Sequence, residues 1–257
     1  MLKALALCCA VVLCCSVASA NAQETSTIAH VIAPGGRLRA AINFGNPVLA
    51  QRDPQTGEAR GVSVALAREL ARRLGVPLEI VGYDAAGKVT DALANDAWDV
   101  AFLAIDPVRA NAIAFTPPYV VIEGAYVVPQ SSPLQANDDV DRAGVRIAVG
   151  RGSAYDLYLT RTIKHAQLVR AATSPAALDL FLNDKLDAGA GVKQPVVKFA
   201  AQHPGLRVLP GRFMVIEQAM ALPKGRSAGS AYLASFVEEL KASGFVDRAL
   251  AESGQGG

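Results

Sequence analysis

An arginine stands just after a short apolar stretch near the middle of the chain. Val100–Ala104 is apolar throughout and predicts a buried strand, and Asp106-Pro107 predicts a turn into a short polar helix that carries Arg109. In open α/β sheets, ligands bind beyond the carboxyl ends of the strands. A guanidinium group donates two parallel hydrogen bonds to a carboxylate. Arg109 is therefore a candidate for holding a carboxylate, although most arginines of a folded chain are simply surface residues.

Alternating strands and helices surround this arginine. The apolar periodicity before it predicts strands at Leu38–Phe44 and Leu78–Tyr83 and helices at Gly61–Leu74 and Gly87–Asn95. After it we expect strands at 145–149, 167–171, 187–192, 206–209 and 217–222, and helices at 153–163, 174–183, 194–202 and 228–251, the last one with a break at Gly244. Such alternation indicates parallel α/β units. We also expect Thr116-Pro117-Pro118 to end the regular structure after Ile113–Phe115.

A second candidate for ligand binding is a segment that predicts a strand, a turn and a helix. Ile147–Gly150 predicts a strand, and Gly150-Arg151-Gly152 predicts a tight turn before a helix that begins with Ser153 as its N-cap. The N-terminus of a helix offers free N–H groups and partial positive charge to an anion. Ser153 can cap its helix and also touch a ligand. Arg151 either projects into the site as a second cation or is an exposed turn residue.

The composition limits the possible functions. The chain has 257 residues, of which 51% are hydrophobic and 19% charged, so it can bury a substantial core and is not globally disordered. A net charge of +2 with scattered basic residues gives no indication of nucleic-acid binding. The three histidines have neither metal-ligand nor catalytic-triad spacing. We therefore expect no catalytic residue, no metal and no cofactor.

The N-terminus predicts a secretory signal peptide. A positive start at Lys3 precedes the apolar run Ala4–Val17 and a small-residue cleavage site, so residues 1–22 are expected to be removed. All four cysteines lie within this segment, which leaves the mature chain without a disulfide or a catalytic cysteine.

The stretch Trp98–Tyr119, WDVAFLAIDPVRANAIAFTPPY, resembles the central signature of the family 3 periplasmic solute-binding proteins, the extracytoplasmic receptors of amino-acid-type ABC importers. The resemblance covers about Leu38–Ser253. It implies an α/β fold of the two-lobe, type II periplasmic-binding-protein class, a clamshell with a cleft and two hinge crossings. One departure is the helix Gly61–Leu74, where Ser63 and Ala65 replace two aspartates of the family.

The resemblance also implies the domain organisation. Lobe 1 is expected to be discontinuous, with residues 36–127 and 217–257, and lobe 2 to comprise residues 128–216. We place the two crossings near Ala125–Gln130 and Met214–Ala221. Periodicity alone would equally permit two consecutive domains.

In the family, the arginine corresponding to Arg109 clamps the α-carboxylate of the ligand, and the residues matching Gly152 and Ser153 touch the ligand from lobe 2. Phe44 is either a ligand contact or a core residue, and for Phe102 the wall of the cleft is favoured over the core. The full set of predicted ligand-binding residues is Arg109, Ser153, Gly152, Ala104, Phe44, Asn46, Phe102, Arg151 and Val192.

The most informative position is one where an acid is absent. Amino-acid-binding members of the family carry an acid near the end of the motif that reads here Asp187-Ala-Gly-Ala-Gly-Val192, and that acid pairs with the ammonium of the ligand. Here Val192 occupies the position. Burying an ammonium without a carboxylate costs several kcal/mol. An organic acid, or an amino acid whose amine is held by Asp106 or Glu123, therefore competes with a standard amino acid, and Lys193 is a candidate to face a second anionic group.

These observations predict a receptor rather than an enzyme. We expect a periplasmic, monomeric binding protein that captures a small carboxylate-bearing ligand by hinge closure and docks on the membrane permease of an ABC importer. The alternative enzyme is a secreted dehydratase of the cyclohexadienyl or arogenate type, but general acid catalysis needs a titratable group where Val192, Lys193 and Pro195 stand. A solute-sensing domain is a third possibility.

Overall fold

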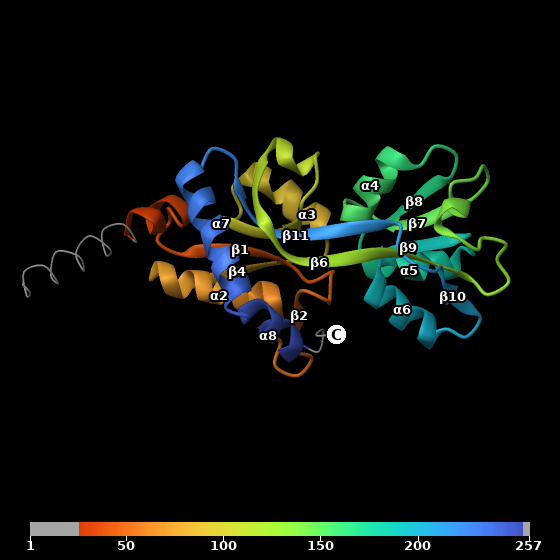
Figure 1. Ribbon diagram of the computed structural model, residues 1–257, viewed down its shortest axis with the longest axis horizontal. Coiled ribbons are helices and arrows are strands. Elements are labelled where there is room, and N and C mark those ends of the chain that lie inside the picture. The colour runs from red at the N-terminus through yellow and green to blue at the C-terminus, as the bar shows by residue number, and fades with distance from the viewer. Residues whose placement is uncertain (1–25, 254–257) are drawn as a thin grey trace, which may run out of the picture.

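The computed structural model describes residues 26–253 and shows two lobes joined by two strands (Figure 1). Within these residues a nine-stranded mixed sheet runs through both lobes in the order β4-β1-β5-β11-β6-β9-β7-β8, and β10 pairs with β6. The predicted two-lobe α/β fold is thereby confirmed. The predicted signal peptide lies outside the described residues, and none of the described helices is long and apolar enough to cross a membrane.

Lobe 1 is built on a parallel strand triplet. Strands β1 (Leu38–Asn43), β4 (Leu78–Tyr83) and β5 (Val100–Ala104) lie side by side, with β1 in the middle. Helices α2 (Val62–Leu74), α3 (Ala86–Asp91), α7 (Ser227–Ala242) and α8 (Phe245–Glu252) surround them. Helix α2 buries its four-residue apolar repeat and ends at Gly75, which adopts the left-handed conformation that favours glycine.

Lobe 2 repeats the strand-helix alternation. It contains β7 (Arg146–Gly150), α4 (Ala154–Thr162), β8 (Gln167–Ala171), α5 (Ser174–Asn183), β9 (Ala188–Val192), α6 (Lys193–Gln202) and β10 (Leu206–Val208). The described chain also contains a helix over residues 26–32. Shorter elements are β2 (Gln51–Arg52), β3 (Ala59–Arg60) and the 3₁₀ turns η1 (Ala92–Asn95), η2 (Arg109–Asn111) and η3 (Asn137–Val140).

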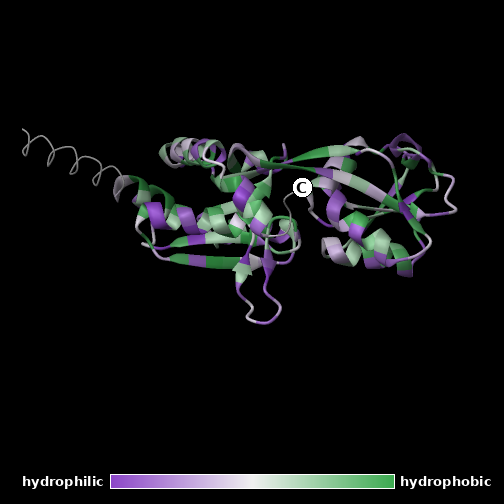
Figure 2. Ribbon diagram, turned by 60° about the horizontal axis from the view of Figure 1, so that its bottom comes forward, coloured by the Kyte–Doolittle hydropathy of each residue, from purple (hydrophilic) through white to green (hydrophobic). Residues whose placement is uncertain are grey.

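Two long strands carry the chain between the lobes. Strands β6 (Ile113–Pro129) and β11 (Met214–Pro223) pair antiparallel along most of their length, and much of this link is hydrophobic (Figure 2). Continuous strands extend through both lobes, so each lobe can move as a body about this link.

The prediction that Thr116-Pro117-Pro118 ends the regular structure was wrong, because β6 runs through these residues. Proline lacks an N–H donor and is tolerated in a sheet at a bulge. The pairing with β11 shifts register beside Pro118, and the N–H of Met220 donates to Oγ1 of Thr116 instead of to a backbone carbonyl. A side-chain hydroxyl thus supplies the hydrogen bond that the irregular backbone omits.

The buried clusters show where the chain passes between the lobes. Ile122 and Ile216 belong to the lobe 1 cluster, whereas Ala125 and Tyr126 belong to lobe 2 clusters. The first crossing therefore lies near Ile122–Ala125, slightly before the predicted Ala125–Gln130. The sequence of β6 is apolar on both sides of this point, so it does not indicate where the strand passes from one lobe to the other.

An ion-pair chain fastens α2 to α7 in lobe 1, and it makes stability depend on pH. Glu69 accepts hydrogen bonds from Arg72 and Arg73, and Arg73 also pairs with Glu239 of α7. The bond from Arg72, followed by that from Arg73, lowers the pKa of Glu69 to about 2. A lowered pKa in the folded state stabilises the protein above the ordinary carboxyl pKa, and that contribution is lost as the pH falls from about 4.5 towards 2.

We expect Glu69→Gln to flatten this part of the pH dependence. Thermal unfolding midpoints measured between pH 5 and pH 2 should fall less steeply for the variant than for the wild type. Glu252→Gln is the matched control, because no ion pair of Glu252 is found within residues 26–253. Equal slopes for the wild type and Glu69→Gln would contradict the assignment.

Candidate ligand-binding site

A cavity lies between the two lobes, at the carboxyl end of β5 and the start of α4. Its volume is about 40 Å³. Among the described residues that line it, Arg109 is the one that carries a charge. The other polar side chains around it are neutral: Asn43, Asn46, Ser63, Ser153, Tyr155, Ser174 and Gln218. No carboxylate lines this cavity within the described chain.

Arg109 is buried and bonded to both lobes. Its Nη1 donates to the carbonyl of Ala104 at 2.9 Å, and its Nη2 donates to the carbonyl of Gly152 at 2.8 Å. The buried Nε makes no hydrogen bond with the described residues. Burial lowers the pKa of Arg109 to about 10, so the side chain remains a cation at neutral pH. A buried cation with a free donor and no carboxylate contact is poised to receive an anion.

The turn after β5 sets the direction of this side chain. Oδ1 of Asp106 accepts the N–H of Val108 at 2.8 Å and so forms the tight turn that leads into η2. Oδ2 of Asp106 pairs with Arg161 of α4 at 2.9 Å. Asp106 is nearly fully buried and does not line the cavity. It therefore bridges the lobes and does not serve as the substitute acid for an amine.

The start of α4 faces Arg109 from lobe 2. Oγ of Ser153 accepts the N–H of Asp156 at 3.0 Å, which confirms the predicted N-cap. The carboxylate of Asp156 accepts the N–H of Gly152 and pairs with Arg170 at 2.9 Å. Ala154 and Tyr155 contribute the first N–H groups of the helix, which have no acceptor inside it. The cavity is thus bordered by a guanidinium on one side and by a helix N-terminus on the other.

The structure brings six of the nine predicted residues to the cavity wall: Arg109, Ala104, Ser153, Asn46, Phe102 and Val192. Gly152 contributes the carbonyl that accepts from Arg109. Phe102 serves as both wall and core, because it also packs edge-on against Tyr119 with ring centroids 6.0 Å apart.

Phe44 and Arg151 do not belong to this lining. Phe44 lies beneath the guanidinium of Arg52, which is 4.3 Å from the ring centroid. Arg151 is exposed at the turn before α4. Both residues were predicted because they are neighbours of site residues along the chain. In the structure, the backbone of a turn directs each side chain away from the cavity.

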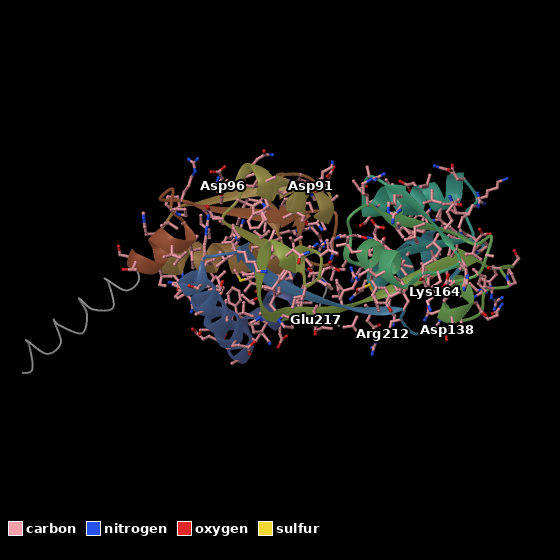
Figure 3. The ribbon with its side chains drawn as sticks, turned by 90° about the horizontal axis from the view of Figure 1, so that it is seen from above. Asp91, Asp96, Asp138, Lys164, Arg212 and Glu217 are labelled. Atoms are coloured by element: carbon pink, nitrogen blue, oxygen red, sulfur yellow. The ribbon has the colours of Figure 1, made fainter. Side chains whose placement is uncertain are left out.

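Lys193 and Glu123 do not line this cavity either, and Glu123 lies where a hinge residue was the simpler expectation. Lys193 pairs with Glu123 at 2.7 Å, and Arg212 pairs with the other oxygen of the same carboxylate at 2.7 Å. The bonds from Lys193 and Arg212 lower the pKa of Glu123. Figure 3 shows Arg212 at the outer edge of the strands that join the lobes. These three side chains form a cluster at the hinge, outside the cavity lining.

Sequence reasoning missed Asn43, Tyr155, Ser174 and Gln218 among the polar residues of the wall. Gln218 had a detectable signal, because it is a buried polar residue at the edge of the apolar run 219–222. Ser174 begins α5, and its Oγ accepts the hydroxyl of Tyr155 at 2.8 Å. Ser63 was noted only as a replacement for an aspartate, and its Oγ lies 3.0 Å from the hydroxyl of Tyr119.

This two-lobed fold with an anion-directed cleft is that of a bacterial solute-binding protein. Residues 38–253 match the family described as bacterial extracellular solute-binding proteins, family 3, and the chain belongs to that family.

Several solved structures share the fold. The P235GK mutant of ArgBP from T. maritima is 25% identical, with a TM-score of 0.74 over 88% of this chain and 98% of that chain. An amino acid ABC transporter substrate-binding protein from Streptococcus pneumoniae, bound to L-arginine, is 20% identical with a TM-score of 0.74 over 88% and 97%. The ancestral amino acid-binding protein AncCDT-1, a precursor of cyclohexadienyl dehydratase, is 20% identical with a TM-score of 0.72 over 88% and 98%.

One curated protein is related in sequence. The virulence sensor protein BvgS from Bordetella pertussis is 29% identical over 151 residues, which are 58% of this chain. The match spans only 12% of the length of BvgS.

The closest backbone approach in the cleft joins Gly152 of lobe 2 to Gly87 of lobe 1. Gly152 has a φ of +68°, and a Cβ on it would lie 2.7 Å from the Cα of Gly87. We expect Gly152→Ala to hold the lobes apart, because backbone atoms cannot yield at that distance. Small-angle X-ray scattering should show a larger radius of gyration than for the wild type.

Gly75→Ala is the matched control for this prediction. Gly75 has a φ of +67°, and a Cβ on it would meet nothing within 4 Å. Both variants carry the same backbone strain, so both should unfold at a lower temperature. A Gly152→Ala protein as compact as Gly75→Ala would refute the steric explanation.

Proposed function

We propose that this protein is the extracytoplasmic receptor of an ABC importer and captures a small carboxylate-bearing solute by hinge closure. The observation that carries the proposal is Arg109, a buried guanidinium that contacts both lobes and whose Nε–H has no acceptor among the described residues. The predicted signal peptide and the extracellular family support a periplasmic location.

The proposed mechanism is a shift of population towards the closed form. In an open form, Arg109 on lobe 1 is separated from Gly152 and Ser153 on lobe 2. A carboxylate bound at the guanidinium lies beside the N-terminus of α4 when the lobes meet, and it interacts with both lobes only in the closed form. This difference in affinity between the two forms drives closure. The closed surface is then what a permease recognises.

The residues that line the cavity at Arg109 indicate the chemical class of the ligand. The relatives with bound arginine support an amino-acid-like solute. The neutral polar wall, with Val192 at the position of the family acid, favours an organic acid or an amino acid whose amine is held by neutral acceptors such as Gln218. Mass spectrometry of solutes that co-purify with the protein would identify candidates directly.

Arg109→Ala should weaken binding of the natural solute by about 2–5 kcal/mol, because the variant leaves the buried carboxylate of the ligand without its partner. Isothermal titration calorimetry with the co-purified solute measures this loss. Arg151→Ala is the matched control, since that neighbouring arginine is exposed and outside the cavity lining. Unchanged affinity in Arg109→Ala would remove Arg109 from the site.

Val192→Asp should add the acid that amino-acid binders possess. Val192 is the N-cap of α6, has extended backbone angles and makes no side-chain capping bond. An aspartate there can cap α6, worth about 1 kcal/mol, and can also pair with an ammonium. We expect a higher thermal midpoint and tighter binding of amino acids.

Val192→Asn separates the two effects, because asparagine caps the helix without supplying a charge. Titration of both variants with the common amino acids should show the gain in Val192→Asp alone. An equal gain in both variants, or in neither, would count against the missing-acid interpretation.

A sensory role is the second candidate, and the relation to the sensor BvgS favours it. A receptor for import stimulates the ATPase of its permease in proteoliposomes when its solute is present, whereas a sensory module does not. The dehydratase alternative has less support, because the cavity lining in the described chain offers no carboxylate or histidine as a general acid. Turnover of prephenate by the purified protein would reverse that ranking.

A further inference from the structure

A second cavity adjoins the one at Arg109. It lies between α5 and α6 of lobe 2 and the lobe 1 segment Gly45-Asn46-Pro47, and it has a volume of about 220 Å³. The two cavities share four wall residues, namely Asn46, Tyr155, Ser174 and Val192. A molecule held at Arg109 can therefore continue past these residues into the larger space.

The size of the first cavity limits what it can hold. One water needs roughly 10–15 Å³ of such space, so 40 Å³ accommodates about three non-hydrogen atoms. A carboxylate group has that size. In the closed form, the remainder of any larger ligand must occupy the second cavity.

Much of the wall of the second cavity is apolar. Pro175, Leu178, Pro195, Val196 and Phe199 are part of it, and Leu178 and Val196 belong to the buried core of lobe 2. Apolar walls favour an apolar occupant, since each buried methylene contributes about 0.8 kcal/mol.

Asp179 and Lys198 also line this cavity, and both residues are exposed. The cavity at Arg109 has no carboxylate in its lining within the described chain. An α-ammonium group beside a carboxylate bound at Arg109 would thus be buried without an acidic partner.

We propose that the ligand is a monocarboxylate with an apolar tail and no α-ammonium. Its carboxylate binds at Arg109, and its tail fills the space between α5 and α6. This inference rests on the proposed capture of a carboxylate at Arg109 and adds the chemical class of the rest of the ligand.

A series of straight-chain carboxylates tests the tail. Calorimetric titration of the full mature protein with acetate, butyrate, hexanoate and octanoate should show affinity rising about four-fold for each methylene until the cavity is filled. An affinity that does not change with chain length, or absence of binding throughout the series, would overturn the proposal.

Two amine-bearing analogues of hexanoate test the absence of an ammonium partner. L-norleucine adds an α-ammonium to the same chain, and 6-aminohexanoate adds one at the far end, where the apolar wall of the second cavity would desolvate it. Both should bind at least ten-fold more weakly than hexanoate. If either binds as tightly as hexanoate, the inference fails.

A cavity-filling variant locates the tail. Phe199→Trp places a larger ring in the wall of the second cavity, so octanoate should bind at least ten-fold more weakly while butyrate changes less than two-fold. Phe245→Trp on α8, another partly buried phenylalanine but outside both cavities, should change neither. Equal losses for butyrate and octanoate in Phe199→Trp would contradict the placement, and the ligand series decides independently if that variant does not fold.

The outcome also separates this inference from the proposed function. An amino acid that binds and requires Arg109, with no binding of octanoate, would refute the apolar tail and leave carboxylate capture intact. Loss of dependence on Arg109 for every bound ligand would refute both.

Discussion

The guanidinium of Arg109 is a positive charge buried where two lobes meet, and the cleft is built around it. The carbonyls of Ala104 and Gly152 accept two of its hydrogen bonds, one from each lobe, and its Nε–H has no acceptor among the described residues. Backbone carbonyls are dipoles and cannot neutralise a full charge in a dry site. The strongest compensation available to that charge is an anion, and this is the physical basis for proposing a carboxylate as the ligand.

Other contacts between the two lobes lie close to this charge. Asp106 reaches across to Arg161 of α4, so a second ion pair joins the lobes on the other side of the turn. Gly87 and Gly152 allow the two backbones to approach where any side chain would collide. The α4 N-terminus arrives opposite the guanidinium, with Ser153 and Asp156 completing its cap. Strands β6 and β11 extend through both lobes, so the motion that assembles these contacts is a rotation about a continuous sheet.

The polar character of the wall then selects among anions. Neutral amides and hydroxyls from five separate segments surround the small cavity at Arg109, and its lining within the described residues contains no acid. The larger apolar cavity beside it accepts the part of a ligand that the first cannot contain.

The sequence by itself determined the local elements and part of the site. Apolar spacing and caps predicted the bounds of β8 and α5 to the residue, and the position of Arg109 after β5 followed from a strand, a turn and a family motif. Ser153 was found as a helix N-cap, whereas Val192 came from the family motif alone. These features depend on neighbours within a few positions, so periodicity and turn chemistry suffice to predict them.

The tertiary structure alone decided the continuity of β6, the orientation of side chains and the residues that surround Arg109. Pro117-Pro118 stay within a strand because β11, about a hundred residues later, pairs with β6 on both sides of an irregular register there. Phe44 turns to Arg52, Arg151 to solvent and Lys193 to Glu123, whereas Gln218 and Ser174 reach the cavity. Each outcome depends on pairing and burial between distant segments, and a linear pattern of apolar and polar residues carries no information about which of them closure will bring together.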